Sequence, residues 1–208
     1  VYPSFPSDAE IARQLDALLV PLLPADGHGA AVLVARNGKA IYRRGFGLAD
    51  LEKKVPVTPE AVFRIGSVTK QFTSALVMRL VDQGKLSLAD PITKYLPDYP
   101  TGGQLITIEN LLTHTAGIAN YTDLPAFMGI STQALSHEAM IDLFKNEPRA
   151  FPPGEGWSYS NSGYYLLGVI IEKVTGRSYA ENLQKEIFGP LGMTHSAYGT
   201  DQPTMPGE

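Results

Sequence analysis

The spacing of apolar residues along the chain changes from a helical period to a strand period and back again. Near the N-terminus, Ser7-Asp8-Ala9-Glu10 has the pattern of a capping box, and the apolar positions after it recur three or four residues apart, at Ile11, Leu15, Leu18, Leu19 and Leu22. Residues 30–35 and 39–45 then favour strands, and Asn37-Gly38 between them is a strong two-residue hairpin signal. The first part of the chain is therefore predicted to form a helix followed by a β-hairpin.

From Ser67 onward the pattern is mostly helical. A helix over residues 69–84 is predicted from apolar positions at Phe72, Leu76, Leu80 and Val81. Further helices are expected to begin at three N-caps, Thr107, Ser136 and Ser178, the last of which opens a second capping box. Segments rich in Gly, Pro and Asn predict loops at 97–103, 116–129 and 147–157.

Composition narrows the class of protein. The 208 residues are 44% hydrophobic and 18% charged, which allows a sizeable core. A formal net charge of −4 without a basic run argues against nucleic acid and anionic membranes as partners, and no apolar stretch reaches membrane-spanning length. The absence of cysteine excludes disulfides and thiolate chemistry, and His28, His137 and His195 lack the spacing of metal ligands, so no metal or cofactor is expected.

Two short motifs carry candidate chemistry, Ser67-Val68-Thr69-Lys70 and Tyr159-Ser160-Asn161. A serine hydroxyl needs a neighbouring base to act as a nucleophile, and a lysine three residues later on a helix shares its face. Tyr159 offers a second group that moves a proton, and the Asn161 amide can orient Lys70 or a substrate carbonyl. Each motif alone is weak, because Ser-x-x-Lys arises by chance and Tyr-Ser-Asn-Ser-Gly is also typical of a turn before a helix.

Longer matches accompany these motifs and resemble a known family. They run in family order through Phe63-Arg64-Ile65-Gly66-Ser67-Val68-Thr69-Lys70, Leu111-Leu112-Thr113-His114-Thr115-Ala116-Gly117, Phe151-Pro152-Pro153-Gly154, Trp157-Ser158-Tyr159-Ser160-Asn161, Leu166-Leu167-Gly168, Glu172-Lys173-Val174-Thr175-Gly176 and Pro190-Leu191-Gly192-Met193. On these segments the chain is identified as a member of the class C β-lactamase superfamily. That superfamily also contains D-alanyl-D-alanine carboxypeptidases, D-aminopeptidases and family VIII carboxylesterases.

The resemblance implies an α+β fold of the β-lactamase/transpeptidase type. Residues 1–60 would supply the first helix and hairpin of an α/β domain, and residues 61–208 a mainly helical domain. It also implies two-step acyl transfer on an amide, lactam or ester carbonyl of a small molecule or peptide. Ser67 would be the nucleophile, Lys70 and Tyr159 its proton-transfer groups, and Asn161 and Tyr121 substrate contacts. A periplasmic or secreted location is the family's usual one.

One family feature is missing from the chain. Members carry a third motif, Lys/His-Thr/Ser-Gly, on a C-terminal strand that also supplies an oxyanion-hole amide, and no credible counterpart occurs before Glu208. We therefore expect an N-terminal portion of a longer protein, with only the first hairpin of the sheet, whose partner is the remainder of that protein. Alone it is not expected to be a competent hydrolase. The alternatives are a family VIII-type carboxylesterase and a non-catalytic fragment that binds peptides or a partner chain.

His114 is the one histidine close to a motif. It stands at the predicted end of the helix that Thr107 opens, where the helix dipole favours a protonated imidazole. For His114 a structural cap with a protonated imidazole is therefore favoured over a catalytic role.

Overall fold

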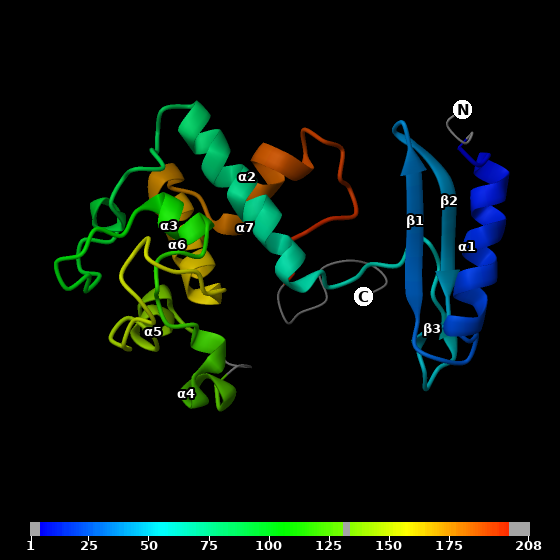
Figure 1. Cartoon of the computed structure of the whole chain (residues 1–208), viewed down its shortest axis with the longest axis horizontal. Coiled ribbons are helices and arrows are strands. Elements are labelled where there is room, and N and C mark those ends of the chain that lie inside the picture. The colour runs from blue at the N-terminus through cyan, green and yellow to red at the C-terminus, as the bar shows by residue number, and fades with distance from the viewer. Residues whose placement is uncertain (1–4, 131–133, 200–208) are drawn as a thin grey trace. The chain divides into compact units, whose positions relative to one another are not determined.

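The computed structural model describes residues 5–130 and 134–199. These residues divide into two compact units, one within Val1–Arg64 and the other within Ile65–Thr200. Figure 1 shows that the first unit holds the long strands and the second holds most of the helices. This combination of helices with antiparallel strands confirms the predicted α+β class.

In the first unit, helix α1 (Asp8–Leu22) packs along a hairpin of two strands (Figure 1). The Ser7 hydroxyl accepts a hydrogen bond from the Glu10 amide at 3.2 Å, so the predicted helix start is confirmed. The second hydrogen bond of a capping box, from the Ser7 backbone amide to the Glu10 side chain, was predicted wrongly. The Glu10 carboxylate instead accepts hydrogen bonds from the Arg13 and Gln14 side chains, one turn later in the helix.

The predicted hairpin consists of β1 (Ala30–Arg36) and β2 (Lys39–Phe46), paired antiparallel. Asn37 and Gly38 form the turn with φ values of 51° and 75°, the left-handed conformation that this dipeptide tolerates. The expectation of a single hairpin is corrected by a second small antiparallel pair, β3 (Leu48–Asp50) with β4 (Val55–Pro56). Strands of three and two residues are too short to leave an alternating pattern in the sequence.

The second unit is built from helices, some of which are joined by long segments such as 83–107 and 143–160. Thr107, Ser136 and Ser178 cap their helices as predicted, and Ser178 with Glu181 completes a full capping box. The segment 116–129, predicted as a loop, contains one turn of 3₁₀ helix and the short α4. The helices are α2 (Thr69–Asp82), α3 (Ile108–Leu112), α4 (Pro125–Met128), α5 (His137–Asp142), α6 (Asn161–Thr175) and α7 (Tyr179–Leu183), and the single turns of other helix types are Gly66–Val68, Ile92–Lys94, Tyr121–Asp123 and Gln184–Phe188.

The core of the second unit joins helices that are distant in the sequence. Helices α2, α3 and α6 each contribute buried side chains to one cluster, among them Leu76, Val77, Ile108, Leu111, Leu166, Leu167 and Ile170. Because α2 and α6 pack in the same cluster, the segments that precede them are brought together. Across the described residues, no helix has both the length and the apolar character needed to span a bilayer.

Candidate active site

Ser67 lies at the entrance to α2. It belongs to a 3₁₀ turn, Gly66–Val68, and the helix predicted over residues 69–84 begins directly after it, at Thr69. Gly66 has a φ of 51°, which a side chain would disfavour, and this conformation directs the chain into the turn. The Ser67 side chain is exposed, and its Oγ accepts a hydrogen bond of 3.3 Å from the Lys70 ammonium.

The Tyr-Ser-Asn motif occupies the start of α6. Ser160 is the N-cap, and its buried hydroxyl accepts a hydrogen bond from the Gly163 amide at 3.2 Å. Tyr159, just before the cap, donates its hydroxyl proton to Ser67 Oγ at 2.6 Å across 92 positions of sequence. Asn161, the first residue of the helix, accepts a 2.7 Å hydrogen bond from Lys70 through Oδ1. The structure therefore brings all four motif side chains into one hydrogen-bonded group.

Asn161 is held in one orientation by two residues outside the motifs, Asn120 and Thr122. The Asn120 side-chain oxygen accepts a hydrogen bond from the Asn161 amide N–H at 2.9 Å. Thr122 Oγ1 accepts another from Asn161 Nδ2 at 3.2 Å, which leaves Oδ1 facing Lys70. Asn120 and Thr122 lie in a stretch that reads only as a polar loop, so no sequence signal distinguished them.

The electrostatic surroundings of Tyr159 favour loss of its proton. Burial raises the pKa of the Tyr159 hydroxyl, but contacts with the Lys70 ammonium and the Ser67 hydroxyl, together with the Lys70 charge, lower it below its ordinary value. The Lys70 ammonium also lies 4.6 Å from the centre of the Tyr159 ring and 5.5 Å from that of Tyr164. A positive charge at this position stabilises a phenolate more than a neutral phenol.

His114 is placed as predicted but in a different protonation state. It follows α3 with a φ of 61°, and its Nδ1 accepts a 3.1 Å hydrogen bond from the Ser160 amide. Burial and then the nearby Lys70 charge lower the pKa of the His114 imidazole. The prediction of a protonated imidazole is therefore wrong. Both effects disfavour the charged ring, and Nδ1 needs a free lone pair to accept the hydrogen bond from the Ser160 amide.

A cavity of about 480 Å³ opens beside these groups, and its lining includes Ser67, Lys70 and Asn161. Tyr121 also lines it, with its ring 4.8 Å from that of Phe127 in an edge-to-face contact. Ligand contact by Tyr121 stays a prediction. Much of the remaining wall is aromatic and polar, from Tyr164, Tyr165, Tyr179, Tyr198, His137 and Glu172.

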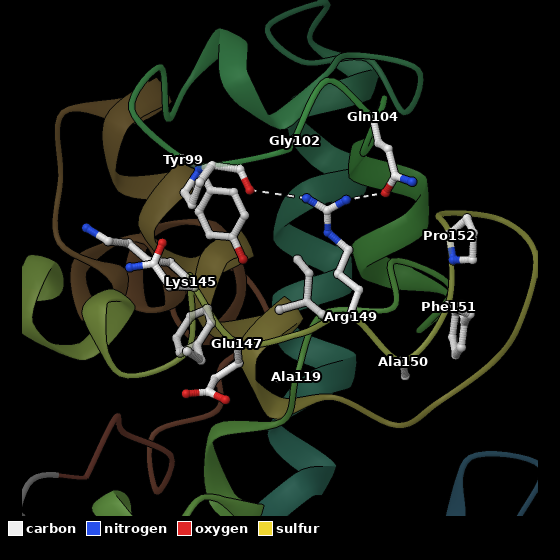
Figure 2. Close-up of a pocket in the computed structure, with 14 residues that line it drawn as sticks. Tyr99, Gly102, Gln104, Ala119, Lys145, Glu147, Arg149, Ala150, Phe151 and Pro152 are labelled. Atoms are coloured by element: carbon white, nitrogen blue, oxygen red, sulfur yellow. Dashed lines mark hydrogen bonds between the residues drawn. The ribbon is translucent and has the colours of Figure 1, made fainter.

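A second cavity, of about 670 Å³, is lined by different residues. Figure 2 shows the Arg149 side chain extending along it to donate a hydrogen bond to Gln104, and a second one of 3.1 Å reaches the Pro100 carbonyl. Burial raises the pKa of Tyr99 in its wall to about 12. Ser67 is not among its lining residues, so the smaller cavity is the one associated with the candidate nucleophile. Within residues 5–130 and 134–199, no group of three or more His, Cys, Asp or Glu side chains has a metal-binding arrangement.

Comparisons with known proteins show which family and fold this chain resembles. The model of the Beta-lactamase family matches residues 15–208. Esterase EstB of Burkholderia gladioli is 34% identical over 210 residues, covering 94% of this chain and 53% of the esterase. The crystal structure of D-amino acid amidase from Ochrobactrum anthropi SV3 complexed with D-phenylalanine superposes with a TM-score of 0.77 at 32% identity, covering 94% of this chain and 53% of the amidase.

A penicillin binding protein from Bacillus halodurans has a TM-score of 0.75 at 30% identity, over 85% of this chain and 53% of that structure. The chain spans between 35% and 53% of the length of these curated relatives. The similarity thus covers most of this chain and between about a third and a half of each relative.

Proposed function

Because the chain belongs to the Beta-lactamase family, we propose that it carries the nucleophile and proton-transfer groups of a serine hydrolase that acts through an acyl-enzyme. The observation that supports this proposal most directly is the convergence of Tyr159 and Lys70 on Ser67 Oγ, at 2.6 and 3.3 Å. A serine that contacts a tyrosine with a lowered pKa and a lysine ammonium beside it has the arrangement of an activated nucleophile.

In the proposed first step, Ser67 Oγ attacks an amide, lactam or ester carbonyl and forms an oxygen–carbon bond. The Ser67 proton passes to Tyr159 as phenolate, with Lys70 stabilising the charge, and then to the leaving nitrogen or oxygen as its bond to carbon breaks. The Ser67 backbone N–H would be one donor to the developing oxyanion. In the second step, the same pair deprotonates a water that releases the acyl group and restores Ser67.

Substrate class is proposed from the cavity and from the printed names of the relatives. One relative is an esterase and another is a D-amino acid amidase, so esters and D-amino amides are the first substrates to compare, with β-lactams as the third class. The aromatic wall of Tyr121, Tyr164 and Tyr165 favours substrates with an aromatic or apolar acyl group. A carboxylesterase would prefer p-nitrophenyl butyrate over D-phenylalanine amide and nitrocefin.

The proposal is tested by covalent labelling of the complete protein with a fluorophosphonate and a fluorescent penicillin, read by intact mass. We expect one label per wild-type chain and none on Ser67→Ala. Ser87→Ala, which removes an exposed serine of the same unit, is the matched control and should label like wild type. Undiminished labelling of Ser67→Ala would refute the assignment, and absence of labelling in wild type would favour the non-catalytic binding fragment.

Lys70 and Tyr159 are proposed to act as one unit, because the Lys70 ammonium contacts the Tyr159 ring and both side chains reach Ser67 Oγ. Lys70→Ala and Tyr159→Phe should each lower the acylation rate strongly. The double variant should lose little more than the worse single variant, since groups that act together are non-additive. Rates that multiply across the two substitutions would argue for independent roles.

A further inference from the structure

His114 is hydrogen-bonded to the backbone on both sides of Tyr159. Its carbonyl oxygen accepts from the Ser158 amide at 3.0 Å, and its imidazole Nδ1 accepts from the Ser160 amide at 3.1 Å. One residue therefore fixes both amides that flank the tyrosine. The left-handed φ of 61° at His114 belongs to this arrangement, because the chain turns here at the end of α3.

The same imidazole contacts the tyrosine side chain itself. Its ring centre lies 4.7 Å from that of Tyr159 and 5.1 Å from that of Tyr164, at interplanar angles of 35° and 34°. The Tyr164 hydroxyl is fixed in turn by a 3.0 Å hydrogen bond to the Leu112 carbonyl. The position of Tyr159 is thus constrained by hydrogen bonds to the neighbouring backbone amides and by the contact between its ring and the imidazole.

The loop that carries His114 is itself paired with the segment before Tyr159. The Gly117 carbonyl accepts from the Ala150 amide at 2.9 Å, and the Thr115 carbonyl accepts from the Gly154 amide at 2.8 Å. Gly117 has a φ of 69°, and a Cβ there would lie 2.1 Å from the Phe151 carbonyl oxygen. The two segments therefore approach too closely for any other residue at Gly117, which keeps His114 at a fixed distance from Ser160.

We propose that His114, in its neutral form, is a positioning residue that holds the Tyr159 hydroxyl against Ser67 Oγ. The proposal rests on the acyl-transfer function proposed above. It requires a hydrogen-bond acceptor at the place of Nδ1, and a second ring proton there would point an N–H at the Ser160 N–H. The charged and titratable groups that face the imidazole are Lys70 from α2, Tyr159 beside the cap and Tyr164 from α6.

Two substitutions separate a positioning role from simple packing. His114→Asn keeps an acceptor, Oδ1, near the place of Nδ1, tolerates a left-handed φ and cannot be protonated near neutral pH. His114→Leu keeps a side chain of similar size but has no acceptor. In the complete protein at pH 7, the Leu variant should lose about 10²-fold in kcat for the best ester or amide substrate with little change in KM. The Asn variant should retain most of the wild-type kcat.

The dependence of kcat on pH distinguishes the positioning role from a packing role, because a side chain that only fills space would not change it. Wild type should lose kcat at acid pH as His114 gains its second proton, and in His114→Asn this loss should shift to lower pH. His28→Asn, which removes an exposed histidine of the other unit, is the control and should keep the wild-type profile. Equal losses in the Asn and Leu variants, an unchanged kcat in the Leu variant, or an unchanged acid limb in the Asn variant would each overturn the proposal.

An NMR measurement keeps this test independent of turnover. The His114 ring should titrate below the ordinary histidine pKa in wild type, and the Ser160 amide should stay protected from exchange in His114→Asn but not in His114→Leu. Loss of protection in both variants, or a His114 pKa at or above the ordinary value, would contradict the neutral acceptor. A wild-type protein with this protection but without Ser67 labelling would overturn the proposed function while supporting the His114 hydrogen bond.

Discussion

The two units of the chain bury their apolar residues to very different extents. In the first unit, α1 has no buried residue, and Leu18 on this helix and Leu33 on β1 are 59% and 63% exposed. In the second unit, α6 buries residues between Ser162 and Ile171, and Leu166 and Leu167 have no exposed surface. Both units begin helices with a serine cap, so local start signals do not determine how much a helix buries.

The difference bears on where the chemistry is located. Ser67, Lys70, Tyr159 and Asn161 all belong to the second unit, and α2 and α6, which position them, share one buried cluster. A site whose hydrogen bonds must hold within a few tenths of an ångström needs a scaffold with few alternative packings. The second unit provides such a scaffold from its own residues.

The largest predicted difference in stability between the two units comes from the loss of a buried leucine. Leu167→Ala should reduce the free energy of unfolding by about 2–5 kcal/mol, because it removes buried area and leaves a cavity. Leu18→Ala, at an exposed position of the first unit, should change it by no more than about 0.5 kcal/mol. Hydrogen exchange followed separately for peptides from each unit measures both effects. Comparable losses for the two variants would mean that the units do not differ in packing.

A smaller effect is expected at the helix starts. Ser178→Ala removes the two hydrogen bonds of the Ser178 hydroxyl, with the Glu181 amide and the Glu181 carboxylate. The capping box starts α7, which packs in the core through Leu183, so the loss should cost about 1 kcal/mol. Ser7→Ala removes a single bond before the exposed α1 and should cost less. Ser178→Thr, which keeps a capping oxygen, is the control. A larger loss for Ser7→Ala, measured by exchange in each unit, would contradict the comparison.

The same contrast explains what the sequence could predict. Short-range signals performed well: Asn37-Gly38, the caps at Thr107 and Ser178, and the pairing of Ser67 with Lys70 each depend on residues within a few positions. The proximity of Tyr159 to Ser67 was expected only from family resemblance, because no local rule connects residues 92 positions apart.

Contacts between residues that are distant in the sequence could not be predicted from it. Asn120 and Thr122 orient Asn161 through tertiary contacts that leave no pattern in the chain. The protonation state of His114 was predicted from the helix end alone, yet burial and Lys70, which comes from another helix, decide its pKa. Glu10 had the right spacing for a capping box but bonds to Arg13 and Gln14, an alternative that the spacing cannot exclude.

The smallest predicted effect compares one carboxylate from each unit. In the second unit, hydrogen bonds from Arg79 and, to a smaller extent, Arg177 lower the pKa of the Glu186 carboxyl group. In the first unit, hydrogen bonds from Tyr42 and, to a smaller extent, Arg44 lower the pKa of the Asp16 carboxyl group. Because each folded-state pKa lies below its unfolded value, the unfolded chain binds more protons in between. The stabilisation is therefore complete above the unfolded pKa, near 4, and is lost as pH falls through the folded pKa.

Glu186→Gln tests this sign, because it leaves the two guanidinium groups near each other without a carboxylate between them. At pH 7 the variant should be less stable than wild type by no more than about 1 kcal/mol, since the arginines are partly exposed and screened by solvent. The difference should shrink toward pH 3, where wild type also loses its charge. Asp16→Asn should follow the same pH trend with a smaller amplitude, because both the Asp16 and the Arg44 side chains are well exposed. Denaturant midpoints measured across pH 3 to 7 decide the outcome, and a gap for Glu186→Gln that widens on acidification would show that its carboxylate does not stabilise the fold in its charged form.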